Sequence, residues 1–109
     1  MYQDKVTLCG SSAYEKKYYL NEDFQGLPDQ IKDELKIVCV LYTEEVGGVL
    51  TVEFDEDGKL SFVTRAEEND FFYDEIGGAL KIKQMQQEKR DLWESLELYY
   101  KVFFLGEEV

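Results

Sequence analysis

The feature that most constrains the fold is a pair of alternating segments joined by a short acidic turn. Residues 49–54 and 59–65 each alternate between apolar and polar side chains, the pattern of a half-buried strand. Between them, Asp55-Glu56-Asp57-Gly58 has turn composition, and its glycine can take a positive φ. We predict an antiparallel hairpin over 49–65, which needs another strand or a helix against its apolar face to be stable. That face would carry Leu50, Val52, Phe54, Leu60 and Phe62.

A helix is predicted over residues 28–46. Pro28 suits the first helical position, where its missing N–H would have no partner in any case. Apolar residues recur every three or four positions, and Gly47-Gly48 supplies a stop. A buried strand over 37–43 is the alternative that stays open, because Ile-Val-Cys-Val-Leu-Tyr-Thr is strongly β-prone.

A longer helix is predicted at the C-terminus, from about 70 to 105. Asn69 or Asp70 can cap its start, and apolar residues follow at helical spacing as far as Phe103. Gly77-Gly78, near its start, could kink or interrupt this helix.

The segment 14–20 fits either a third strand or a short helix, because residues 12–15 have the spacing of a capping box. With 109 residues, the chain is expected to form one domain, residues 1–109. The fold class predicted is α+β. The helix at 28–46 and the C-terminal helix at about 70–105 would cover one face of a small antiparallel sheet, with the hairpin at its centre and a possible third N-terminal strand.

The charge balance argues against two classes of partner. The chain has 24 acidic and 12 basic residues, a formal net charge of −12. Nucleic acids and anionic membrane surfaces are bound through clustered Lys and Arg, so we expect neither as a partner. The first five residues lack the apolar stretch of a signal peptide, and the longest apolar run, 37–42, is too short to span a membrane. We therefore expect a cytoplasmic protein.

The sequence carries no motif for catalysis or cofactor binding. It has no His, no phosphate-binding glycine loop and no GxSxG nucleophile motif. With 24 acids, adjacent carboxylates occur by chance and indicate no catalytic pair. Cys9 and Cys39 form no CxxC pair and are expected to be free thiols, with Cys39 in the core. We predict a protein that is not an enzyme and has no catalytic residue, metal site or cofactor.

Acidic residues concentrate between 44 and 75, where eleven acids stand against Lys59 and Arg65, a net −9 of the total −12. The simplest interpretation is a solvated face that keeps a small domain in solution. The functional interpretation is a landing surface for a protein partner with a basic surface. A calcium loop is poorly matched, because Gly58 stands fourth in its acidic run rather than sixth. The candidate acidic face consists of Glu53, Asp55, Glu56, Asp57, Glu67, Glu68 and Asp70.

Four aromatic doublets stand out in a chain of this size. Adjacent rings point to different sides of the element that carries them, so one ring of each pair can enter the core while the other points elsewhere. Rings left at the surface would suit an interface, where Tyr and Phe are enriched. The doublets are Tyr18-Tyr19, Phe71-Phe72, Tyr99-Tyr100 and Phe103-Phe104, and the candidate interface is Tyr99, Tyr100, Phe103 and Phe104.

Several segments together resemble a known family. They are Thr43-Glu44-Glu45-Val46-Gly47-Gly48, Phe54-Asp55-Glu56-Asp57-Gly58, Tyr73-Asp74-Glu75-Ile76-Gly77, Leu80-Lys81-Ile82-Lys83 and Tyr99-Tyr100-Lys101-Val102-Phe103-Phe104-Leu105. From about Cys9 to Leu105 the chain resembles a family of small acidic uncharacterised proteins from anaerobic Gram-positive bacteria, a domain of unknown function. The resemblance implies a cytoplasmic bacterial protein and no assigned activity.

The function these features favour is a non-enzymatic interaction or adaptor domain, a homodimer joined through the long C-terminal helix. One alternative is a small-molecule or ion-binding domain with a pocket between sheet and C-terminal helix. Another is a binder of a partner protein similar to the small acidic chaperones of bacterial secretion systems, which the chain resembles in size, acidity and element order.

Overall fold

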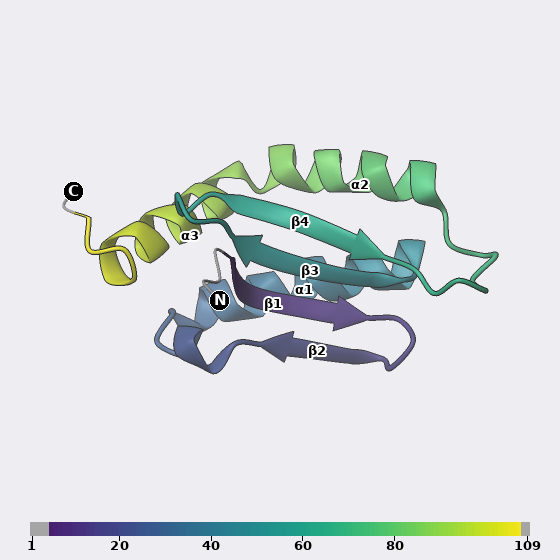
Figure 1. The fold of residues 1–109 in the computed structure, drawn as a ribbon, viewed down its shortest axis with the longest axis horizontal. Helices are drawn as coiled ribbons and strands as arrows, with labels where there is room; N and C mark the ends of the chain where they lie inside the picture. Colours follow the sequence, from purple (N-terminus) through teal and green to yellow (C-terminus); the bar gives the residue numbers. More distant parts are fainter. Residues whose placement is uncertain (1–4, 108–109) are drawn as a thin grey trace.

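The computed structural model describes residues 5–107 and has the predicted α+β architecture. Within these residues an antiparallel sheet of order β2-β1-β3-β4 is accompanied by three α-helices and a short 3-10 helix, η1 (Figure 1). The strands are β1 (Val6–Ser12), β2 (Lys17–Leu20), β3 (Val49–Phe54) and β4 (Leu60–Arg65). The helices are η1 (Glu22–Phe24), α1 (Asp29–Val46), α2 (Glu75–Glu88) and α3 (Arg90–Phe103).

The hairpin prediction is confirmed by β3 and β4, which pair in register with Val52 opposite Phe62. The turn is closed by the Asp55 carboxylate, whose Oδ1 accepts the amides of Asp57 and Lys59, both at 2.9 Å. Gly58 has a φ of +83°, and a Cβ there would lie 2.9 Å from the Lys101 side chain. The turn therefore needs glycine both for its conformation and for the space it leaves to α3.

The central strand of the N-terminal region, β1, was not among the predicted elements. It pairs with β2 on one side and with β3 on the other, and its register shifts between Thr7 and Cys9. The ambiguous segment 14–20 is a turn followed by the edge strand β2. The predicted third strand therefore exists, but it reaches the hairpin only through β1.

The helix prediction for 28–46 is confirmed by α1, and the open alternative over 37–43 is settled as helix. Its buried residues, Leu35, Val38, Cys39, Tyr42 and Thr43, recur at helical spacing. Pro28 precedes the first helical residue, and the Gly47 amide donates to the Thr43 carbonyl oxygen at 2.9 Å.

The stretch predicted as one helix from about 70 to 105 is helical from 75 to 103 but is divided at Lys89. Lys89 leaves the helical region, with φ −113° and ψ 29°. The Met85 carbonyl oxygen accepts both the Lys89 amide and the Trp93 indole N–H, each at 3.0 Å, so α3 is bonded back to the last turn of α2. The break falls here and not at Gly77-Gly78, and the cap is Asp74 rather than Asn69 or Asp70.

All the packing lies on one face of the sheet. Leu50, Val52 and Phe54 of β3 are fully buried, whereas the alternate residues of β3 stay partly exposed. In Figure 1, α1 lies behind β1 and β3 while α2 runs beside β4. Phe24 of η1 and Tyr100 of α3 both stack on Phe54, with ring centroids 5.6 and 4.2 Å away.

Both cysteines are free thiols, as predicted, and Cys39 lies in the core as expected; Cys9 is buried there as well. Cys9 of β1 faces Cys39 of α1, with the two sulfur atoms 3.8 Å apart. The pair links the central strand to the helix that covers it.

Candidate interaction surface

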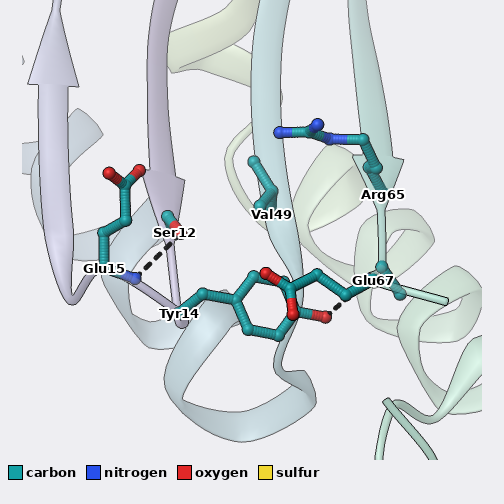
Figure 2. A pocket seen from close by; sticks show the side chains of 7 residues that line it. Ser12, Tyr14, Glu15, Val49, Arg65 and Glu67 are labelled. Carbon is teal, nitrogen blue, oxygen red and sulfur yellow. Dashed lines mark hydrogen bonds between the residues drawn. The ribbon is translucent and has the colours of Figure 1, made fainter. Parts of the chain in front are cut away.

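Residues 66–74, here called the aromatic loop, connect β4 to α2 and are held at one end by Tyr14. The Tyr14 hydroxyl donates to Asp70 Oδ2 at 2.6 Å and accepts the Glu67 amide at 2.9 Å. Figure 2 shows Tyr14 reaching from the β1–β2 turn across the start of β3 to the segment after β4. The bond to the Asp70 carboxylate is the main reason that the pKa of Tyr14 is raised.

The other end of the aromatic loop is held by Tyr73. Its hydroxyl lies 3.3 Å from that of Tyr42 in α1, and burial followed by this contact raises the pKa of Tyr42. The Asp74 carboxylate then accepts the Gly77 amide at 2.9 Å and caps α2. The loop is thus fixed at both ends by side-chain hydrogen bonds.

Between these anchors the loop presents two aromatic rings to solvent. Phe71 is 89% exposed and Phe72 is 96% exposed, and the Phe72 amide donates to Asp70 Oδ1 at 3.0 Å. Ile76 and Leu80 on the first turns of α2 are exposed as well. We call Phe71, Phe72, Ile76 and Leu80 the loop-side apolar surface.

The rim of this surface is mostly acidic, with Lys83 as a basic residue beside Ile76 and Leu80. Residues 66–80 contain five acidic residues and no basic one. Among the described residues, none of those five carboxylates forms an ion pair. The negative charge of these five carboxylates is therefore not neutralised by ion pairs within the described part of the chain.

The predicted acidic face is not one continuous face. Asp55, Glu56 and Asp57 form the β3–β4 turn at the start of β4, while Glu67, Glu68 and Asp70 follow its end. Asp55 and Asp70 also hold local backbone, as described above. The structure therefore splits the predicted face into a turn cluster, the intervening Glu53 on β3, and the aromatic-loop cluster.

The predicted aromatic interface is only partly at the surface. Tyr100 is 5% exposed and belongs to the core, so it is not available to a partner. Tyr99 is half-buried, with its ring near Phe24 and Phe103. Phe103 is 70% exposed and Phe104 is partly exposed, beside the exposed Leu98 and Leu105. We call Leu98, Phe103, Phe104 and Leu105 the α3 end.

The two surfaces lie far apart. Figure 1 shows the aromatic loop and the C-terminal end of α3 at opposite ends of the longest axis, which measures 46 Å. The anchors Tyr14 and Tyr73 were missed by sequence reasoning. Tyr14 is 56 positions from Asp70, and no local pattern connects residues so far apart.

A comparison with protein families finds that the family of unknown function DUF6145 matches residues 5–108. The chain belongs to this family. DUF6145 carries no assigned activity, in agreement with the predicted resemblance to a family of unknown function. No curated protein and no solved structure matches the chain.

Within the described part of this DUF6145 chain, no three Cys, Asp or Glu side chains are grouped to hold a metal ion. Over the same residues, no helix is long and apolar enough to cross a membrane. The ligand-binding alternative places a pocket between the sheet and the C-terminal helix. Between β3 and α3 the stacked rings of Phe54, Tyr100 and Phe24 fill the space, whereas a cleft of about 610 Å³ lies between β4 and α2 and is lined by Phe62 and Tyr73.

Proposed function

We propose that the chain is a non-enzymatic protein-interaction domain. Its loop-side apolar surface would bind a protein partner that offers an apolar pocket rimmed by basic residues. The observation that carries the proposal is the near-complete exposure of Phe71 and Phe72 on a loop tied down at both ends.

Energetics support an interface at this place. Moving one phenylalanine side chain from water into an apolar pocket contributes roughly 1.5–3 kcal/mol, and two adjacent rings are available. The hydrogen bonds of Tyr14 and Tyr73 hold the loop in place before binding, which lowers the cost of ordering it.

Charge selects the kind of partner. The acidic rim attracts a basic surface and accelerates encounter at low salt. A second copy of this chain carries the same rim and a net charge of −12, so like charges oppose self-association there. The partner at the loop side is therefore a different, basic protein.

The test uses a defined probe, an amphipathic peptide of alternating Leu and Lys, with a Leu and Glu peptide as its control. Titration should shift amide NMR signals of residues 67–80, and only with the basic peptide. In the double variant Phe71→Ser/Phe72→Ser the affinity should fall by at least about 100-fold, because two buried rings contribute roughly 3–6 kcal/mol. Shifts spread over every acidic site, or unchanged affinity in the double variant, would contradict the proposal.

A second proposal assigns homodimerisation to the α3 end. Residues 98–106 contain one basic residue and no acidic one, so two copies can meet there without like-charge repulsion. Phe103, whose side chain is 70% exposed, supplies the apolar contact.

Light scattering after size exclusion tests this assignment. A dimer is expected at low and at high salt, because an apolar contact is not screened. Phe103→Ser should give a folded monomer, while Phe72→Ser should leave the dimer intact. A wild-type monomer at 0.1 mM protein, or a folded Phe103→Ser dimer, would rule it out.

A further inference from the structure

A second feature of the surface, away from both apolar regions, is a cleft between the β1–β2 hairpin and α1. Its volume is about 670 Å³, within the range of small-molecule sites. The hairpin contributes residues on both sides of its turn, and α1 contributes one face from Lys36 to Glu44. We call it the lysine cleft.

Its charge is opposite to that of the chain. Lys16, Lys17 and Lys36 line the cleft together with a single acid, Glu44, although the protein carries a net charge of −12. In the described region, residues 5–107, none of these three lysines forms an ion pair. Three uncompensated ammonium groups from two elements therefore border one cleft, and they favour an anion there.

The backbone that carries two of these lysines is fixed. Lys16 has a φ of +54°. Among the described residues it is the only one other than glycine with a positive φ. A residue with a full side chain persists in this region only when its surroundings hold it, and such residues cluster at functional sites. The turn is held by the Ala13 amide, which donates to the Gly48 carbonyl oxygen at 2.8 Å, and by the Glu15 amide, which donates to Ser12 Oγ at 3.2 Å.

The remaining wall of the cleft contains both polar and apolar side chains. Ser11 and Thr43 are buried, with their hydroxyl oxygens 2.8 Å apart, and the Thr43 hydroxyl donates to the Val40 carbonyl oxygen at 3.1 Å, so this polar part of the wall is held by internal hydrogen bonds. Val40 and the ring of Tyr18 add apolar surface. The cleft is much larger than a bare phosphate requires, so it has room for an organic portion beside the charged one.

We propose that the lysine cleft binds a small organic phosphate. The phosphate group would lie among Lys16, Lys17 and Lys36, whose compact ammonium groups act as point charges on its oxygens. The organic portion would pack on Val40 and Tyr18. This site is separate from the loop-side apolar surface, so the peptide titration and the test below can succeed or fail independently.

The test compares adenosine monophosphate, inorganic phosphate and adenosine by amide NMR titration of the full chain. Adenosine monophosphate should shift the signals of Lys16, Lys17 and Lys36, and should bind at least tenfold more tightly than either of the other two. The double variant Lys16→Gln/Lys36→Gln should weaken its binding at least tenfold. The matched control Lys5→Gln/Lys59→Gln removes the same charge elsewhere and should leave binding unchanged.

Three results would overturn the proposal. The first is the absence of shifts in the cleft with 10 mM adenosine monophosphate. The second is an equal loss of binding in the control variant, which would indicate a general charge effect. The third is equally tight binding of inorganic phosphate, which would exclude a role for the organic portion. Unchanged melting temperatures would show that the variants are folded.

Discussion

Two of the regions with aromatic doublets, 99–104 and 71–72, have opposite structural roles. Tyr99-Tyr100 and Phe103-Phe104 lie on α3, where the rings of Tyr100 and Phe104 stack with centroids 5.1 Å apart. Phe104 in turn stacks on Phe24, at 4.8 Å. Phe71 and Phe72 lie on the aromatic loop and contact solvent on nearly their whole surface.

The difference arises from what lies beneath each doublet. α3 lies over β3, so a ring pointing inward meets Phe54 and gains both burial and stacking. The aromatic loop leaves the end of β4, and its inward contact is made by Tyr73 instead. The rings at 71–72 are therefore left at the surface, because Tyr73 supplies the inward contact of the loop.

The largest expected effect compares one residue of each region. Tyr100→Ala should lower the free energy of unfolding by about 3–5 kcal/mol, because it leaves a cavity in the aromatic stack. Phe72→Ala should change it by less than about 0.5 kcal/mol, because the ring is almost fully exposed. Chemical denaturation measures both.

Tyr100→Leu is the milder companion variant, with a smaller loss of stability expected than for alanine. If Phe72→Ala destabilised the protein as much as Tyr100→Leu, the contrast between the two regions would be lost.

The second effect is alkaline sensitivity of the interior. Contact with Cys9 and burial raise the pKa of Cys39, and burial raises the pKa of Tyr18 and Tyr42. Above pH 9 the unfolded thiol loses a proton that the folded one keeps, so stability should fall with pH. The slope from Cys39 is about 1.4 kcal/mol per pH unit, and the tyrosines add to it above pH 10.

Denaturation curves between pH 7 and 11 measure this slope. In Cys39→Ala the decline should begin nearer pH 10, where the buried tyrosines start to ionise in the unfolded chain. A flat profile up to pH 11 in the natural protein would show that the interior does not hold these groups protonated.

The β3–β4 hairpin and α1 were predicted correctly, because local sequence patterns mark both their ends and their buried faces. The hairpin has its alternation and turn, and α1 has its proline, its stripe and its glycine stop. By contrast, β1 contains Cys9, Gly10 and two serines, which have little strand preference of their own. It is a strand because β2 and β3 supply hydrogen bonds on both sides, and no local pattern records that.

The same limit applies to the candidate site. The sequence shows acidic and aromatic residues together at 67–72, but the predicted interface was placed at 99–104, because composition does not say which rings reach solvent. That outcome depends on Tyr14 and Tyr73, whose partners are 56 and 31 positions away. The division at Lys89 likewise reflects packing, since α2 lies against α1 and α3 against the sheet.

The third effect concerns the contact that holds the loop side in place. A Cβ on Gly78 of α2 would lie 2.8 Å from the Tyr42 hydroxyl and 3.0 Å from a Val46 methyl carbon. Gly78→Ala should therefore destabilise the protein by about 1–2 kcal/mol, although alanine favours helix. Ala79→Gly, at an exposed neighbouring position, is the control for helix propensity and should cost about 1 kcal/mol. A stabilised Gly78→Ala variant would show that α1 and α2 are not in tight contact.

The smallest change is confined to the aromatic loop. Tyr14→Phe keeps the ring but removes the hydroxyl that bonds Asp70 and the Glu67 amide; Figure 2 shows the bond to Glu67. Hydrogen exchange at the Glu67 amide should accelerate on the order of fivefold, the loss of one ordinary hydrogen bond, with the melting temperature almost unchanged. The control is Tyr19→Phe, because the Tyr19 hydroxyl makes no hydrogen bond among the described residues. This variant should leave the exchange of the Glu67 amide unaltered.

Tyr14→Phe also tests whether the anchoring of the aromatic loop contributes to peptide binding, apart from the contacts that Phe71 and Phe72 make with the peptide. Phe71 and Phe72 remain in Tyr14→Phe, but their loop loses one of its two anchors. If order in the free protein contributes to binding, the basic peptide should bind several-fold more weakly to Tyr14→Phe than to Tyr19→Phe. Equal affinities, together with faster exchange at Glu67, would show that the two rings act without help from the anchor.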